Sequence, residues 1–153
     1  MVLAQEVLEE KVAVGDRVAV IGAEQVGCEV AEFLAERGSR VTLMRRGATI
    51  AGDSSPAYRT FVEGWLPEKG VALMPGVTYE EINEEGIAVR DRTGKAVLIQ
   101  ADTIVVAAGS LPEEGLFRSL MGSHPEIHRI GDCVEPRDIL AAVYEGYDAA
   151  CSI

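Results

Sequence analysis

The sequence has too few basic residues and too short apolar runs for several classes of protein. Its 153 residues include 14 Lys and Arg against 25 Asp and Glu, which gives a net charge of −11. Because a nucleic-acid-binding protein needs a basic face to neutralise phosphates, this balance argues against that class. No apolar run approaches the ~18 residues that span a bilayer, and the N-terminus lacks the basic start and apolar stretch of a signal peptide. We therefore expect a cytoplasmic protein that binds neither nucleic acid nor membrane.

Cysteine and histidine are also scarce, and their spacing matches no common site. Cys28, Cys133 and Cys151 are odd in number and far apart, and none stands in a CxxC pair. This pattern argues against a disulfide framework, a zinc site and the redox dithiol of a disulfide reductase. His124 and His128 are four residues apart, but a proline separates them and no Glu-rich helix frames them. We expect reduced thiols and no bound metal, with Cys28 a packed side chain rather than a reactive thiol.

The first 45 residues alternate between strand and helix patterns. Residues 17–21 form a short β-branched run that ends at Gly22, and residues 40–44 form a second apolar run. Between them, residues 25–37 place apolar side chains at helical spacing before Gly38. This order predicts a βαβ unit with two parallel strands and a right-handed crossover.

The chain then continues the alternation and changes to short strands. Residues 57–69 predict a helix and residues 71–74 a strand, while three short segments within 77–100 predict an antiparallel meander. Residues 102–108 form an apolar run typical of a strand buried on both faces. The pattern predicts an α/β fold: a Rossmann-like three-layer domain, with helices on one side of a parallel sheet and the meander on the other.

The last third of the chain is less regular. Residues 109–126 are rich in turn-forming types, residues 127–130 predict a strand, residues 131–136 predict a turn, and a helix is expected from residue 137 on. Apolar side chains follow one stripe of that helix. Because an apolar stripe needs a partner, we expect it to fold back on the domain or to support a homodimer.

A glycine-containing turn after the first predicted strand is the main functional signal. The turn GAEQVG opens the first helix, which is the position of a dinucleotide-binding fingerprint. There, one glycine makes the tight turn, a second lets the backbone approach the pyrophosphate, and a third permits close packing of helix on strand. Glu24 replaces the second glycine and brings a carboxylate to the expected pyrophosphate site. The candidate coenzyme-binding residues are Gly22, Ala23, Glu24, Gln25, Val26 and Gly27; the alternative is a purely structural βα turn.

Two arginines follow the second predicted strand. In dinucleotide-binding folds an acidic residue about 20 positions after the first glycine bonds the ribose 2′-hydroxyl of NAD, whereas Arg accommodates the 2′-phosphate of NADP. Arg45 and Arg46 lie at this position, 23 and 24 residues after Gly22. The pair favours NADP(H) over NAD(H), because guanidinium groups match phosphate geometry. The alternative is two solvated surface arginines.

Several stretches resemble a known family. They are RVAVIGAEQVGCEVAEFLAERGSRVTLMRRG, VALMPGVTYEEI, TIVVAAGSLP and RIGDCVEPRDILAAVYEGYDAA. These resemble the C-terminal half of the NAD(P)H-dependent flavin oxidoreductases of the 2,4-dienoyl-CoA reductase and enoate reductase type. The resemblance implies a parent with an Old Yellow Enzyme-like barrel that carries FMN and an iron-sulfur cluster. A glutathione-reductase-like half that binds FAD and NAD(P)H follows the barrel in that family.

The resemblance also suggests a domain division and further site residues. It assigns residues 1–126 to an NAD(P)H-binding domain and residues 127–153 to the end of the FAD-binding domain. Ala108 and Gly109 match the crossing strand that returns toward the FAD domain. Gly131 and Asp132 match the GD pair whose Asp contacts FAD, and Asp132 is otherwise a turn or capping residue.

These observations lead to two hypotheses of different class. The first is a pyridine-nucleotide-binding domain of a larger flavin-dependent oxidoreductase, not catalytic by itself and without tightly bound FAD. Its partners are the coenzyme and the remainder of the parent enzyme. The second is a non-catalytic Rossmann module in which Glu24 has closed the site and which bridges subunits. A less favoured third hypothesis, a small FAD domain, conflicts with Arg45, because an acidic ribose ligand is expected there.

Overall fold

A computed structural model describes residues 1–124 and 126–153. These form two compact units, unit 1 (Met1–Ala108) and unit 2 (Gly109–Ile153), which are described separately. Residue 125, in the stretch expected to be rich in turns, lies outside the described residues. The domain division expected after residue 126 rests on the family resemblance and stays a prediction.

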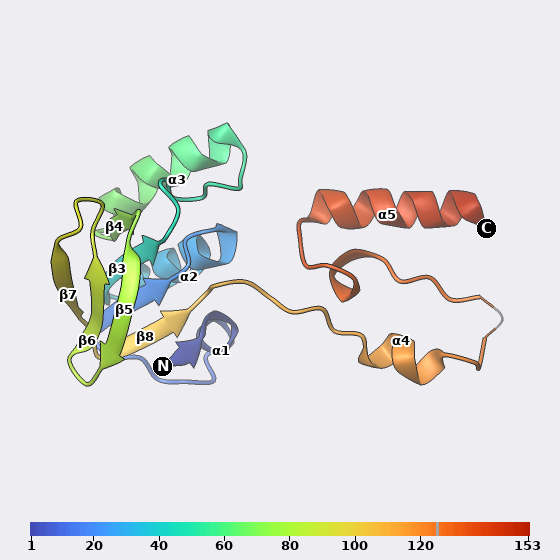
Figure 1. Cartoon of the computed structure of the whole chain (residues 1–153), viewed down its shortest axis with the longest axis horizontal. Helices are drawn as coiled ribbons and strands as arrows, with labels where there is room; N and C mark the ends of the chain where they lie inside the picture. Colours follow the sequence, from blue (N-terminus) through green and yellow to red (C-terminus); the bar gives the residue numbers. More distant parts are fainter. Residues whose placement is uncertain (125) are drawn as a thin grey trace. The chain divides into compact units, whose positions relative to one another are not determined.

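Unit 1 is built on a five-stranded parallel sheet (Figure 1). The strand order is β1 (Val2–Leu3), β8 (Thr103–Val106), β2 (Arg17–Ile21), β3 (Arg40–Arg45) and β4 (Ala72–Pro75). The parallel pairing of β2 with β3 confirms the predicted βαβ unit. The strand β1 was not predicted; it has two residues and forms where it pairs with the end of β8.

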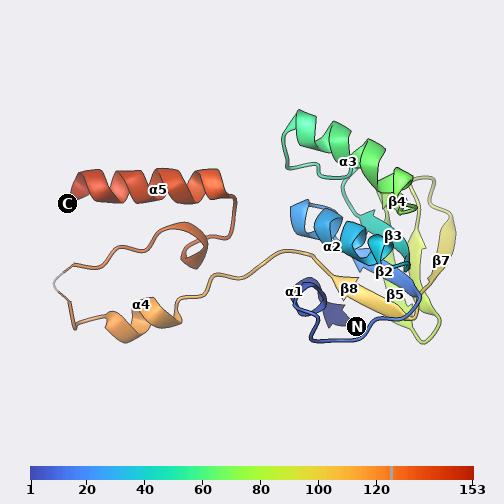
Figure 2. The ribbon, with the colours of Figure 1, turned by 180° about the vertical axis from the view of Figure 1, so that it is seen from behind.

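Three helices cover one face of this sheet (Figure 2). They are α1 (Ala4–Leu8), which was not predicted, α2 (Gln25–Glu36) and α3 (Pro56–Glu68). Val18 and Val20 of β2 face this layer and pack in one buried cluster with Val30 and Leu34 of α2. The apolar side chains at helical spacing in α2 therefore bury one face of the helix against the sheet.

The opposite face is covered by an antiparallel sheet of β5 (Thr78–Asn83), β6 (Gly86–Arg90) and β7 (Ala96–Gln100). A second buried cluster joins the two sheets. Ala19, between the two valines of β2, packs there with Met44, Ile87 and Val89. Because successive side chains of a strand point to opposite faces, a strand covered on both sides is apolar throughout. The predicted three-layer α/β fold is confirmed.

Unit 2 contains α4 (Gly115–Leu120), the short 3-10 helix η1 (Gly131–Cys133) and α5 (Ile139–Ser152). The strand expected at residues 127–130 is wrong, because these residues form no strand and pair with no other segment that the structure describes. The turn-rich stretch contains α4, which was not expected. The last helix begins two residues later than expected, after Asp138, whose carboxylate accepts a hydrogen bond from the Ala141 N–H at 2.8 Å.

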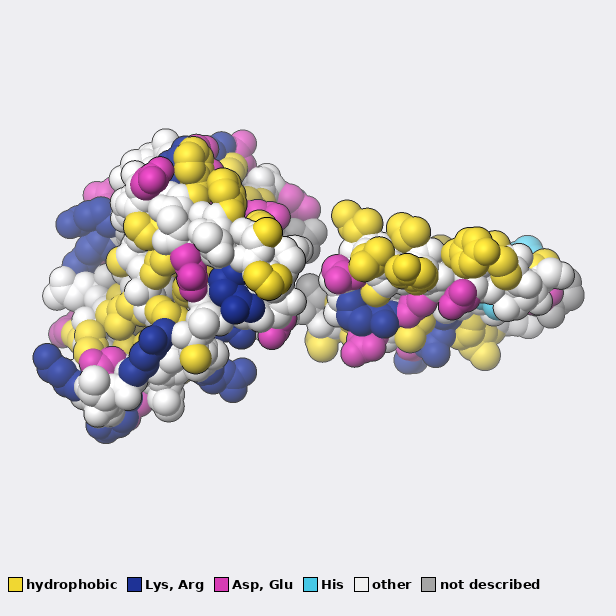
Figure 3. All heavy atoms as spheres, turned by 90° about the horizontal axis from the view of Figure 1, so that it is seen from above, with side chains coloured by type: hydrophobic (Ala, Val, Ile, Leu, Met, Phe, Trp, Pro, Cys, Tyr) yellow, Lys and Arg dark blue, Asp and Glu magenta, His cyan; other side chains and the backbone are white. Residues whose placement is uncertain are grey.

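None of the side chains of α5 is buried. Its large apolar residues lie 63 to 84% exposed, and Figure 3 shows hydrophobic side chains grouped on the face of unit 2 where α5 lies. They are Ile139, Leu140, Val143, Tyr144 and Tyr147. Across the part of the chain that the structure describes, no helix has the length and apolar character needed to cross a membrane.

Candidate functional site

Gly22 makes the tight turn at the carboxyl end of β2. Its φ of +101° lies in the left-handed region, and a Cβ there would stand 2.2 Å from the carbonyl oxygen of Ala107. Its N–H donates to the carbonyl oxygen of Met44 at 2.9 Å. The turn is therefore held between the ends of β3 and β8, and only glycine fits both the φ angle and the space.

Gly27, in the first turn of α2, packs against the same loop. A Cβ at this position would stand 1.9 Å from the carbonyl oxygen of Gly22. The helix can approach the turn this closely only because residue 27 has no side chain. Gly22 and Gly27 thus have the backbone roles that the fingerprint gives to its first and third glycines.

The backbone N–H groups at the start of α2 have no acceptor among the described residues. The first hydrogen bond within the helix runs from the Cys28 N–H to the Glu24 carbonyl oxygen at 2.9 Å, and Glu24 makes no side-chain cap. Among the described residues, no side chain accepts from the N–H groups of Gln25, Val26 or Gly27. Unsatisfied N–H groups and the helix dipole at such an end favour phosphate binding.

Glu24 does not point its carboxylate at these N–H groups. One carboxylate oxygen, Oε1, pairs with Nη1 of Arg45, and the other, Oε2, accepts the Asp53 N–H at 3.2 Å. The carboxylate that replaces the second glycine of the fingerprint is thus held by a neighbouring cation and by a loop. This arrangement leaves the start of α2 without a negative cap.

The two adjacent arginines have different surroundings. Arg45 is enclosed: its side chain is 17% exposed, and Asp53 Oδ2 lies 3.7 Å from its Nη2. A Cβ at Gly47 or Gly52 would stand 2.6 or 2.7 Å from its guanidinium nitrogens, so the loop can wrap Arg45 because both positions are glycine. Arg46 is exposed and forms no ion pair or side-chain hydrogen bond within residues 1–124 and 126–153.

The loop after β3 is hydrogen-bonded to the glycine turn through Ala51, a residue that was not among the predicted site residues. The N–H of Ala51 donates to the carbonyl oxygen of Ala23 at 2.7 Å. Ala51 is fully buried and has a φ of +49°, which is uncommon for a residue other than glycine. With the bond from Asp53 to Glu24, this contact fixes the loop beside the turn. The glycines at 47 and 52 are the only available sequence signal, and they do not reveal the partner.

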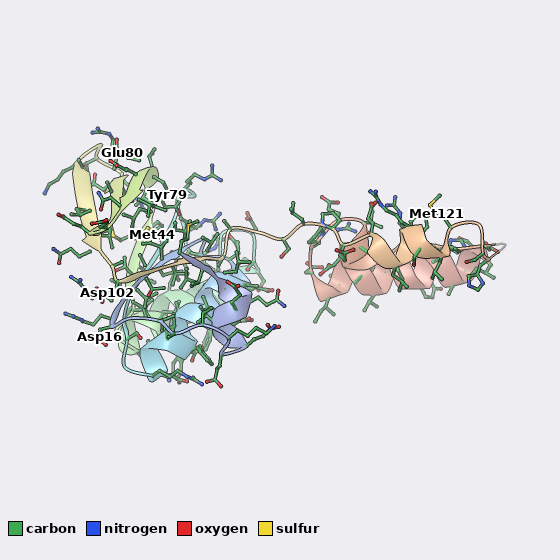
Figure 4. The ribbon with its side chains drawn as sticks, turned by 90° about the horizontal axis from the view of Figure 1, so that it is seen from below. Asp16, Met44, Tyr79, Glu80, Asp102 and Met121 are labelled. Carbon is green, nitrogen blue, oxygen red and sulfur yellow. The ribbon has the colours of Figure 1, made fainter. Side chains whose placement is uncertain are left out.

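Tyr79 of β5 also reaches the turn, and the sequence analysis missed it as well. Its hydroxyl donates to the carbonyl oxygen of Met44 at 3.1 Å (Figure 4). Burial raises the pKa of Tyr79 above its ordinary value. The hydroxyl therefore stays protonated at neutral pH and acts as a donor. No spacing rule in the sequence links residue 79 to residue 44.

Cys28 is a packed thiol, as the sequence analysis expected. Its side chain is 2% exposed. Burial, with a smaller contribution from Glu24 and Glu29, raises the pKa of the Cys28 thiol from 9.0 to about 12. A reactive cysteine needs a lowered pKa, so the position of Cys28 in the first turn of α2 does not make it a nucleophile.

The remaining predicted site residues lie around the end of unit 1 and in unit 2. The backbone nitrogen of Ala108 would stand 3.1 Å from a Cβ on Gly22, so Ala108 lies beside the turn. Gly109, with a φ of +111°, is the first residue of unit 2.

Gly131 and Asp132 form a second group within unit 2. The Gly131 N–H donates to Glu145 Oε2 at 2.5 Å, and Asp132 Oδ1 accepts the Arg137 N–H at 3.3 Å. The Gly131 N–H and then Arg137 hold the pKa of Glu145 below its ordinary value. Asp132 thus makes the turn contact that was one of its two predicted roles, and the Glu145 contact was not predicted.

The two histidines lie apart from these groups. His128 Nε2 lies 2.8 Å from Glu126 Oε1. Within residues 1–124 and 126–153, no three His, Cys, Asp or Glu side chains are placed to hold a metal ion.

A family model described as pyridine nucleotide-disulphide oxidoreductase matches residues 3–146. The chain belongs to this family. Membership of the pyridine nucleotide-disulphide oxidoreductase family implies NAD(P)H and FAD as cofactors. The glycine turn at the end of β2 and the open N–H groups of α2 fit a dinucleotide pyrophosphate at that position.

Relatives within the family are redox enzymes. The chain is 33% identical to an NADH oxidase of Thermoanaerobacter brockii and 29% identical to a cinnamate reductase of Clostridium sporogenes, over 98% of its own length in each case. It covers 24% and 23% of those proteins. A solved 2-naphthoyl-CoA reductase matches with a TM-score of 0.88 and 32% identity, over 97% of this chain and 23% of that one. The chain thus spans about a quarter of the length of these proteins.

Proposed function

We propose that this chain is the NAD(P)H-binding domain of a larger flavin-dependent oxidoreductase of the dienoyl-CoA and enoate reductase type. The observation that carries the proposal is the turn from Gly22 to Gly27, with open N–H groups at the start of α2. The similarity to a cinnamate reductase and a 2-naphthoyl-CoA reductase supports this branch of the family.

The chain's own groups have the following roles in this proposal. The N–H groups of Gln25, Val26 and Gly27 bind the pyrophosphate of the coenzyme, and Ala108 lines the turn. Arg46, the exposed arginine, contacts the 2′-phosphate of NADP(H), which keeps the preference for NADP(H) that the arginine pair predicts. When bound, NAD(P)H would supply a hydride for the FAD of the parent protein. The chain positions the coenzyme and is not catalytic by itself.

In this proposal, unit 2 supplies part of the FAD site. Gly131 and Asp132, with the start of α5, form the end of the FAD site, as the resemblance implies, and Gly109 belongs to the segment that returns toward the FAD domain. FMN and an iron-sulfur cluster belong to the barrel of the parent enzyme. Because this chain holds only part of an FAD site, it purifies without stoichiometric flavin; a yellow preparation with one flavin per chain contradicts that expectation.

Calorimetric titration tests the coenzyme site, with NADPH, NADH, ADP and FAD as ligands. Val26 is 48% exposed in the first turn of α2, where a carboxylate is tolerated by the helix but repels a pyrophosphate. We expect the unsubstituted chain and Val26→Asn to bind NAD(P)H, and Val26→Asp to lose most of the affinity. Asn and Asp have nearly the same shape, so equal binding by both variants contradicts a pyrophosphate at this helix end.

A second candidate function rests on Glu24, which occupies the position of the second glycine. In this alternative, the chain is a non-catalytic Rossmann module that bridges subunits of its parent. The variant Glu24→Gly distinguishes the two functions. Binding of nucleotide by the variant, with none by the unsubstituted chain, supports the bridging module.

A further inference from the structure

We propose that Glu24 is a specificity-determining residue that withholds Arg45 from the coenzyme 2′-phosphate. This inference rests on the proposed coenzyme site and concerns which groups distinguish NADPH from NADH. The sequence presents Arg45 and Arg46 as equivalent phosphate ligands, whereas the structure gives them different electrostatic surroundings.

Arg45 is engaged by two carboxylates. Its Nη1 pairs with Glu24 Oε1, and its Nη2 lies 3.7 Å from Asp53 Oδ2. One guanidinium therefore faces two carboxylates, within a side chain that is only 17% exposed. A 2′-phosphate that approached Arg45 would compete with Glu24 and would meet the negative charge of both carboxylates.

Glu24 lies at the N-terminus of α2. It is the residue that precedes the first turn of the helix, next to the proposed pyrophosphate site, and its Oε2 accepts the Asp53 N–H at 3.2 Å. Glu24 therefore acts on specificity by neutralising Arg45.

Arg46 is then the cation available to the 2′-phosphate. It is exposed and unpaired within the described residues, unlike Arg45. We expect Arg46→Gln to lower the ratio of NADPH affinity to NADH affinity. In Glu24→Gln, by contrast, Arg45 is released from a charged partner while the shape of residue 24 and its acceptor for the Asp53 N–H are kept.

The decisive experiment measures dissociation constants for NADPH and NADH with Glu24→Gln and with the double variant Glu24→Gln, Arg45→Gln. We expect Glu24→Gln to raise the NADPH to NADH affinity ratio about tenfold, the equivalent of one charge-assisted hydrogen bond. The double variant should return the ratio close to that of the unsubstituted chain. Glu29→Gln is the matched control, because it removes the same charge from an exposed position of α2 and should leave the ratio unchanged.

Three outcomes overturn the inference. An unchanged ratio in Glu24→Gln means that the ion pair does not limit Arg45. A ratio that stays raised in the double variant means that Glu24 acts by repulsion alone, without Arg45. Absence of binding of either nucleotide to the unsubstituted chain and to every variant removes the proposed coenzyme site itself, and is thereby distinguishable from the other two.

Discussion

The hydroxyl of Tyr79 and the N–H of Gly22 donate to one acceptor, the carbonyl oxygen of Met44, at 3.1 and 2.9 Å. Tyr79 belongs to the antiparallel sheet, whereas Gly22 follows β2 and Met44 lies in β3, two neighbouring strands of the parallel sheet. The layer opposite the helices thus contacts the glycine turn directly. This gives the antiparallel sheet a role in shaping the candidate coenzyme site, in addition to covering the core.

Tyr79→Phe should therefore weaken both the fold and the turn. Loss of this partly buried hydrogen bond costs about 1 kcal/mol of unfolding free energy, and we expect a moderate loss of NAD(P)H affinity with it. Urea unfolding and calorimetric titration measure the two effects. Tyr144→Phe is the control, because the Tyr144 side chain lies 63% exposed on α5. Equal stability of the two variants would show that the hydroxyl of Tyr79 does not support the turn.

Gly27→Ala should destabilise unit 1, because its Cβ would stand 1.9 Å from the Gly22 carbonyl oxygen and the helix must move away. Overpacking of this kind costs about 1–3 kcal/mol. Gly64→Ala should change the free energy of unfolding in the opposite direction. Gly64 lies within α3, and a Cβ there meets nothing within 4 Å. Replacing this helical glycine should stabilise the protein by about 0.5–1 kcal/mol. Thermal or urea unfolding of both variants checks the opposed signs.

Stability should fall as the pH rises through the alkaline range. Burial raises the pKa of Cys28 in the folded protein from 9.0 to about 12, so the folded state retains a proton that the unfolded state releases. The associated stability is complete below about pH 9 and is lost as the pH rises toward 12. Urea unfolding across this range should show a smaller decline for Cys28→Ala than for the unsubstituted protein.

The control for this pH effect is Cys151→Ala, because Cys151 is exposed. It should follow the pH profile of the unsubstituted protein. Part of the decline should remain in Cys28→Ala, since burial also raises the pKa of Tyr58, to about 12. An identical profile for both cysteine variants would show that Cys28 does not cause the decline.

The homodimer predicted through the last helix remains to be tested. If α5 pairs with a second copy, sedimentation should show a dimer that Val143→Glu converts to a monomer, because a charge would enter the apolar stripe. Leu111→Glu is the control at an exposed apolar position outside α5. Deletion of residues 127–153 should likewise leave a monomer. A protein that sediments as a monomer at every concentration contradicts the prediction.

Local pattern was sufficient for most of unit 1. The β-branched runs at 17–21 and 40–44 and the helical spacing between them gave the βαβ unit, because both periodicities reflect which faces are buried. The short strand β1 and the segment at 127–130 show the limit of such patterns. A segment of two to four residues becomes a strand only if a partner lies beside it, and β8 provides one for Val2–Leu3.

The three-layer fold and the place of the glycine turn follow from local patterns, because apolar spacing and the steric freedom of glycine are properties of neighbouring residues. The tertiary structure alone decided how the turn is held. The contacts Glu24–Arg45, Ala23–Ala51 and Met44–Tyr79 join residues 21 to 35 positions apart. Such pairs depend on where loops and layers meet, so only the folded chain could show that Arg45 is engaged and Arg46 is free among the described residues.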